Sequence, residues 1–254
     1  MKYYVAGLLQ WYRATIREQN RQTLQRLAHE EADDDELMRR FHDGEIDFTS
    51  ENMMDRFDEI AERFNLDGVV VEGTREYSDE YLEPQWSALR DRVRESAKEE
   101  FKDTLELPLE LKVLFTLVDN LIGPDLPRHR ACIQLEINGG FSPIPVSQDV
   151  DFMDCVEAYD SEAFVEIGAG WPIGDQDTSG YIPWAIWCRV LDTEDKQTEL
   201  RPWGWRYVIW PIEAPAKLHY DLKSLLEHHA IHFKEEDQVS DLYSPCLLWW
   251  RCCF

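Results

Sequence analysis

The sequence predicts an α+β fold in which helices pack on one face of a mostly antiparallel sheet, with a helical extension at the N-terminus. Apolar residues recur at helical spacing through the first half of the chain. Short β-prone runs bounded by Gly, Asp and Pro follow in the second half. Because the helical segments come first and do not alternate with the strand-like segments, a parallel sheet built from βαβ units is not expected.

The N-terminal third is predicted to be helical. Apolar residues spaced by threes and fours between Val5 and Ile16 predict a first helix, and the opposite face of this helix carries arginines. The acidic run Glu30–Glu36 is typical of a solvated linker or helix face. A second helix is expected to begin after Ser50, which can serve as its N-cap, and to end near Asn65.

Two further helices are predicted in the middle of the chain. The first begins at Pro84, since proline at a helix start loses no hydrogen bond, and its apolar stripe continues to Phe101. The second begins at Leu107 and Pro108 and ends at Asp119-Asn120. Both helices present apolar residues at three- and four-residue intervals, so one face of each is expected to cover the sheet.

The second half of the chain is predicted to contain the sheet and a closing helix. In the predicted strand Tyr181–Leu191, the even-numbered residues from Ile182 to Val190 share one face and Trp187 lies on the other. Asp192–Pro202 is expected to form a hairpin loop, and Asp221–Phe233 a final helix. The predicted strands are Ala131–Ile137, Phe164–Ile167, Tyr181–Leu191 and Trp205–Ile212.

These elements suggest three units: a helical extension over residues 1–75, an α+β domain over 76–235 and a tail over 236–254. The length of 254 residues suits one large domain with appendages. No apolar run is long enough to cross a bilayer and no signal peptide is recognisable, so a cytoplasmic or nuclear protein is expected. The six cysteines form no CxxC pair and are expected to be free thiols.

The net charge restricts the class of partner. The chain has 51 acidic and 26 basic residues and a formal charge of −25. Such a field repels phosphate backbones, which argues against nucleic acid and favours another protein, above all a basic one. Peripheral membrane contact through the basic first helix or through Cys252 and Cys253 is a weaker alternative, because Arg251 occupies the cysteine position of a prenylation motif. Docking of the first helix on its own domain is favoured.

The motifs that could carry chemistry are incomplete. Asp175 and Asp177 begin a calcium-like loop, but Ile186 stands where the closing acid belongs. His228 and His232 have metal-ligand spacing without a third ligand, so a capping or surface role is favoured. The acids of residues 149–160 are expected to form a solvated loop or docking surface, and the cysteines to fill apolar sites. Neither a catalytic residue, a metal nor a cofactor is expected.

The order of elements resembles the SUKH superfamily, which includes fungal Smi/Knr-type regulators of cell-wall synthesis and bacterial toxin-immunity proteins. The resemblance extends from Trp86 to Phe233, although Leu121 stands where the family usually has the glycine of an Asn-Gly turn. It is carried by the Trp-led helix Trp86–Leu105, the Leu-Pro helix Leu107–Leu121, the segment Ile167–Trp187 with its Trp-Pro turn, the strand Trp205–Ile212 and the helix Asp221–His232.

This resemblance implies a non-enzymatic adaptor or regulator that acts by binding another protein. An immunity-type inhibitor of a basic toxin is the first alternative, and a metal-dependent hydrolase is the second. A membrane-associated scaffold is weaker than either. The candidate binding surface comprises Trp171, Asp175, Asp177, Trp184, Trp187 and Trp203, because aromatic residues are enriched at protein interfaces.

Overall fold

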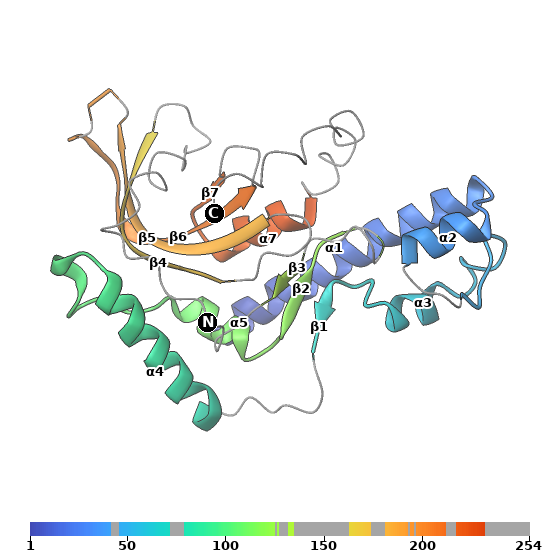
Figure 1. Ribbon diagram of the computed structural model, residues 1–254, viewed down its shortest axis with the longest axis horizontal. Helices are drawn as coiled ribbons and strands as arrows, with labels where there is room; N and C mark the ends of the chain where they lie inside the picture. The colour runs from blue at the N-terminus through green and yellow to red at the C-terminus, as the bar shows by residue number, and fades with distance from the viewer. Residues whose placement is uncertain are drawn as a thin grey trace, which may run out of the picture.

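The protein combines helices with antiparallel sheets, which confirms the predicted α+β class (Figure 1). A computed structural model describes residues 1–41, 46–71, 79–124, 126, 132–134, 163–173, 181–192, 194–195, 197–211 and 217–231. The described strands form two sheets, one of three strands and one of four, where the sequence predicts a single sheet. Every described strand pair is antiparallel.

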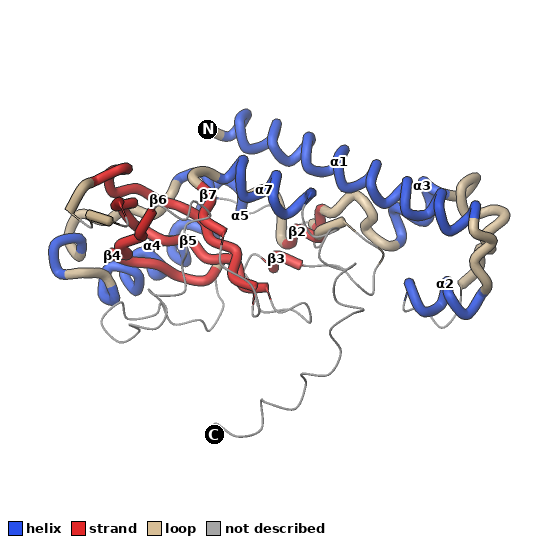
Figure 2. The backbone as a smooth tube through the Cα atoms, turned by 90° about the horizontal axis from the view of Figure 1, so that it is seen from above, coloured by secondary structure: helices blue, strands red, loops and turns tan. Residues whose placement is uncertain are grey.

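The N-terminal helix α1 (Lys2–His29) extends along the molecule and contributes to two hydrophobic cores (Figure 2). Its first half places Val5, Leu8, Tyr12 and neighbouring apolar residues in the core of the larger sheet. Its second half joins the other core, where Leu24 and Leu27 are buried. The two cores therefore divide within α1.

The second core is a small helical layer at the C-terminal end of α1. It is completed by α2 (Asp34–Phe41), α3 (Phe57–Arg63) and Leu126. The helix predicted to begin after Ser50 begins instead at Phe57, after a series of turns. The Asn52 side-chain oxygen accepts a hydrogen bond from the Thr49 backbone N–H at 2.8 Å, and the Met53 N–H donates to the Thr49 carbonyl at 2.9 Å, so these bonds hold the first of the turns.

A short sheet joins the N-terminal part of the chain to the middle. Its strands are β1 (Val69–Val70), β2 (Asn120–Ile122) and β3 (Cys132–Gln134), in that order. Gly68, just before β1, has φ +74°, and a Cβ on it would lie 2.6 Å from the Ile122 carbonyl oxygen and 2.8 Å from Ile16. Only glycine fits this close approach of β1, β2 and α1.

The helices in the middle of the chain differ at their ends from the prediction. Helix α4 (Asp79–Ser96) begins before Pro84 and contains it, so proline here lies within the helix. The stripe through Trp86, Leu89 and Val93 is buried as expected, but a 3-10 turn, η1 (Glu99–Phe101), follows the helix. Helix α5 (Leu109–Phe115) ends early, because residues 120–122 pair with β1 as strand β2.

The larger sheet has the strand order β4-β5-β6-β7. The predicted hairpin loop is shorter than expected, since Glu199 and Arg201 pair with β5 and the Asp192 N–H donates to the Thr198 carbonyl at 3.0 Å. Strand β7 is not predicted from the sequence. The elements are β4 (Ala163–Pro172), β5 (Tyr181–Asp192), β6 (Glu199–Pro211), β7 (Lys217–His219) and the closing helix α7 (Leu222–Ile231).

Helices α1, α4, α5 and α7 cover one face of this sheet (Figure 1). Trp171, Ala185 and Tyr207 share that face by strand register and belong to the core formed with these helices. On the other face, Ile186, Cys188 and Val190 are also buried. The predicted common face of these even-numbered residues is thus confirmed, and β5 carries buried residues on both of its faces. Among the described helices, none combines the length and apolar character needed to span a bilayer.

Candidate functional site

The predicted binding residues occupy different environments. Trp171 is 2% exposed and Trp184 is 7% exposed, so their side chains belong to the interior and are not available on the surface of the monomer. Trp187 and Trp203 are only partly buried, and they lie together on the helix-covered face near η1. Asp175 and Asp177 lie outside the described residues, as do the acids of residues 149–160.

A row of aromatic rings leads from the core to this partly exposed place. Trp171 meets Trp205 with ring centroids 5.2 Å apart, and Trp205 meets Trp187 at 5.6 Å. Phe101 of η1 then contacts Trp187 at 6.1 Å and Trp203 at 4.6 Å. All four contacts are edge-to-face, the arrangement that the ring quadrupoles favour. The outer tryptophan is therefore held by a rigid aromatic support.

Two cations lie against the outer tryptophan. The Lys98 Nζ is 5.6 Å from the centroid of the Trp203 ring, and the Arg189 Cζ is 5.4 Å from it. Both cations also bind Glu166, with Lys98 Nζ 2.6 Å from Oε1 and Arg189 Nε 2.6 Å from Oε2. One carboxylate thus fixes two cations beside one indole. A second acid, Glu199, also pairs with Arg189, with its Oε2 3.8 Å from Arg189 Nη1.

The electrostatic effect on Glu166 has two opposing causes. Partial burial raises its pKa, whereas the hydrogen bonds from Lys98 and Arg189 lower it. The hydrogen bonds prevail and the pKa lies below its ordinary value, so Glu166 is ionised at neutral pH. We call the group formed by Lys98, Phe101, Glu166, Trp187, Arg189 and Trp203 the aromatic–cation surface.

The backbone of β4 makes room for these side chains. A register shift between Ile167 and Ala169 places Gly168 at a bulge, and its carbonyl accepts the Lys98 N–H at 2.8 Å. A Cβ on Gly168 would lie 2.6 Å from Phe101 Cε2 and 3.0 Å from Trp203 Cζ3. The missing side chain lets both rings rest on the strand, and the carbonyl anchors the turn that leads into η1.

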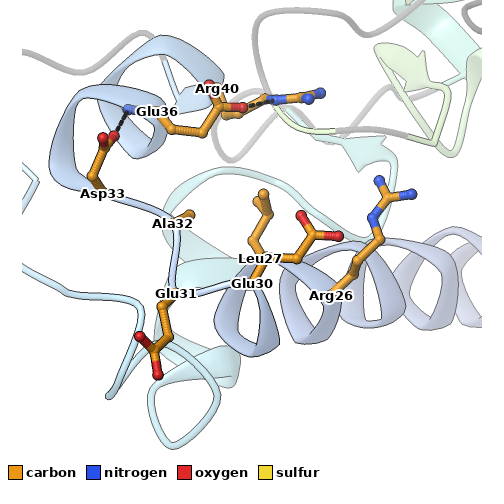
Figure 3. A pocket seen from close by; sticks show the side chains of 8 residues that line it. All are labelled: Arg26, Leu27, Glu30, Glu31, Ala32, Asp33, Glu36 and Arg40. Carbon is orange, nitrogen blue, oxygen red and sulfur yellow. Dashed lines mark hydrogen bonds and ion pairs between the residues drawn. The ribbon is translucent and has the colours of Figure 1, made fainter.

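A cavity of about 590 Å³ lies elsewhere, between the end of α1 and α2 (Figure 3). Two of its acids are already engaged: Asp33 Oδ1 accepts the Glu36 backbone N–H at 2.8 Å, and hydrogen bonds from Arg39 and Arg40 lower the pKa of Glu36 to about 2. Such a carboxylate does not hold a proton for transfer near neutral pH. The lining residues are Arg26, Leu27, Glu30, Glu31, Ala32, Asp33, Glu36 and Arg40.

Cys188, one of the residues considered for a reactive role, lies in the interior. Burial raises the pKa of the Cys188 thiol to about 12, which confirms its expected apolar role and opposes nucleophilic use. His228 is partly buried and meets His219 edge-to-face, with centroids 4.8 Å apart, while His232 lies outside the described residues. Within the ranges described above, no group of three or more His, Cys, Asp or Glu side chains could hold a metal ion.

Two arginines on the basic face of α1 form ion pairs with other segments of the chain. Arg13 pairs with Asp67 at 2.6 Å and Arg17 with Asp58 at 2.5 Å. On the apolar side, the Tyr12 hydroxyl donates to the Ile122 carbonyl at 2.8 Å and lies 2.6 Å from His229 Nδ1. The favoured docking of this helix on its own domain is thereby confirmed.

Comparison of the chain with protein-family models, with curated proteins and with solved structures found no significant match.

Sequence reasoning found two members of the aromatic–cation surface, Trp187 and Trp203, and missed the charged side chains beside them. Lys98 and Glu166 are 68 residues apart, and Glu166 and Arg189 are 23 apart. The available signal is the alternation in β4 and β5: a charged residue within an otherwise apolar strand requires a partner of opposite sign beside it. Glu166 and Arg189 are such residues, and they pair directly in the strand register.

Proposed function

We propose that this protein is a non-enzymatic protein-interaction module of the cytoplasm, with the role that its SUKH-like order of elements implies: a regulator of the Smi/Knr type. The aromatic–cation surface is its contact with the partner. The single observation that supports this proposal is the partly exposed Trp203, which is held against Lys98 and Arg189 on a rigid aromatic base.

The composition of this surface is that of an interface centre. Trp and Arg are the residues that most often dominate binding energies, and they do so where neighbouring contacts already fix their conformations. Glu166 fixes Arg189, and Phe101 fixes Trp203. A partner that covers them gains a large apolar area with little loss of side-chain entropy, because both side chains are ordered before binding.

The net charge supports a second candidate function. A charge of −25 accelerates the encounter with a basic protein and disfavours acidic competitors. An immunity-type inhibitor of a basic toxin would use the same property. The two roles differ in the captured partner: a secreted basic toxin encoded beside this chain supports inhibition, and a component of a signalling or wall-synthesis pathway supports regulation.

The proposal is tested by affinity capture with the full chain as bait in an extract of its native cells. We expect a specific protein partner that is lost with Trp203→Ala and with Arg189→Gln. Tyr3→Ala is the matched control, because it removes an aromatic side chain that is 95% exposed on α1, a helix that contributes no residue to this surface. Retention of the partner by both surface variants, or the absence of any specific partner, contradicts the proposal. Circular dichroism of each variant verifies that it is folded.

A further inference from the structure

A second group of charged and aromatic residues lies on the opposite face of β6. The Arg201 and Arg206 Cζ atoms lie 5.5 and 5.4 Å from the centroid of the Tyr220 ring, respectively. Tyr220 is 46% exposed, Arg201 is exposed and Arg206 is partly buried. We call these three residues the arginine–tyrosine group. Its guanidinium groups lie on an aromatic ring, an arrangement that orders them, and the N–H groups of the exposed Arg201 remain available.

Strand register accounts for this arrangement. Tyr207 pairs with His219, so Tyr220 follows β7 beside Arg206. Register shifts near Val190 bring Arg201 to the same face as Arg206. Gly204 lies between them, and a Cβ there would be 2.5 Å from Arg206 Nη1. The glycine lets the Arg206 guanidinium lie across the strand, where Nη1 donates to the Trp205 carbonyl at 2.8 Å.

The two arginines differ from most others in the described part of the chain. Arginines elsewhere pair with carboxylates, as Arg13, Arg56 and Arg94 do. Arg201 and Arg206 form no ion pair with any described residue, and the buried Arg206 Nε has no hydrogen-bond partner there. The adjacent Asp221 caps α7 instead of pairing with either arginine, and its Oδ1 accepts the Ser224 backbone N–H at 2.8 Å.

We propose that the arginine–tyrosine group binds a carboxylate-rich segment of the protein partner. This inference rests on the proposed function and adds the chemistry of one contact. Guanidinium groups bind carboxylates through paired, charge-assisted hydrogen bonds. Tyr220 supplies an apolar platform for the carbon atoms of the bound segment.

The positive charge of the arginine–tyrosine group, on a chain that is acidic as a whole, explains why we expect an acidic protein segment to bind there and not a nucleic acid. On a chain of net charge −25, a long polyanion meets repulsion along its whole length. A few carboxylates on a partner contact only the local positive group, within about one Debye length of 8 Å at physiological salt. A local charge opposite to that of the whole molecule also fixes the orientation in which a basic partner docks.

The test is an NMR titration of the full chain at physiological salt. The probe is a peptide of alternating Glu and Gly residues, and the matched control peptide has Gln in place of Glu. The Nε–Hε resonances of Arg201 and Arg206 are assigned from the Arg201→Gln and Arg206→Gln variants. We expect the Glu peptide to shift these two resonances and the Gln peptide to leave them unchanged. We also expect either substitution to weaken binding about tenfold, as loss of one charge-assisted hydrogen bond produces.

Arg26→Gln is the control variant, because Arg26 lies on α1 next to the separate cavity. No shift at Arg201 and Arg206, or equal weakening by Arg26→Gln, overturns the inference. Inorganic phosphate that displaces the peptide at equal concentration also overturns it, since the group would then be a general anion site. These outcomes are independent of the partner capture that uses Trp203→Ala, so the inference can fail while the proposed function stands.

Discussion

Glu166→Gln removes the charge that holds the aromatic–cation surface together and leaves the size of the side chain unchanged. The carboxylate accepts from Lys98 and Arg189, each at 2.6 Å, and the three side chains are between a quarter and a third exposed. Exposed ion pairs contribute about 0.2 to 1 kcal/mol each, because solvent screens them. Glu166→Gln breaks two pairs that share one partly covered carboxylate. We therefore expect the free energy of unfolding to fall by about 1 kcal/mol.

The pH dependence of this loss follows from the lowered pKa of Glu166. A carboxyl whose pKa is lower in the folded than in the unfolded state stabilises the fold above its unfolded pKa. That contribution disappears as the pH falls through the lower, folded pKa. The difference in unfolding free energy between the native chain and Glu166→Gln should be constant from pH 7 to about 5 and should shrink at more acidic pH.

Urea denaturation at several pH values measures this difference. Glu227→Gln is the matched control, since its pair with Lys223 is longer, at 3.4 Å, and both side chains are more exposed. The control should lose less than about 0.5 kcal/mol. An unchanged stability of Glu166→Gln at pH 7, or a loss that persists undiminished in acid, refutes the reasoning that the carboxylate binds both cations.

Two further predictions concern the backbone and core. Tyr12→Phe should lower the unfolding free energy by about 1 to 3 kcal/mol in urea titrations, because it leaves buried polar groups, including His229 Nδ1, without the hydroxyl; unchanged stability would show that this bond contributes nothing. Gly168→Ala should cost about 1 to 3 kcal/mol through overpacking, since its Cβ would lie 2.6 Å from Phe101. It should also weaken partner binding, and a calorimetric affinity equal to that of the native chain contradicts this.

Residue spacing predicted the elements whose stability depends on their own apolar face. Helix α1 and the strand β5 appear close to their expected positions because continuous periodic or β-prone runs define them. Strand β2 was not predictable in this way. Leu121 continues the helical spacing of α5, and only pairing with Val69, 52 positions earlier, makes it part of a strand. Tertiary pairing prevails there over local preference.

The candidate site was only partly predictable for a similar reason. Trp171 and Trp184 lie on opposite faces of the sheet, yet both are buried because both faces are covered. Nearly continuous apolar strands such as β5 indicate burial on two faces, and this pattern distinguishes them from strands with one solvated face. The charged side chains around Trp203 come from distant segments of the chain. Their convergence depends on the fold and cannot be predicted from residue spacing in the sequence.

Hydrogen–deuterium exchange of the complex with its captured partner tests the central claim most directly. If the aromatic–cation surface binds the partner, exchange should slow at the amides of η1 and at the start of β6, which carry Phe101 and Trp203. The helical layer of α2 and α3 should exchange as it does in the free protein. Protection confined to α2 and α3, with unchanged exchange around Trp203, would contradict the account.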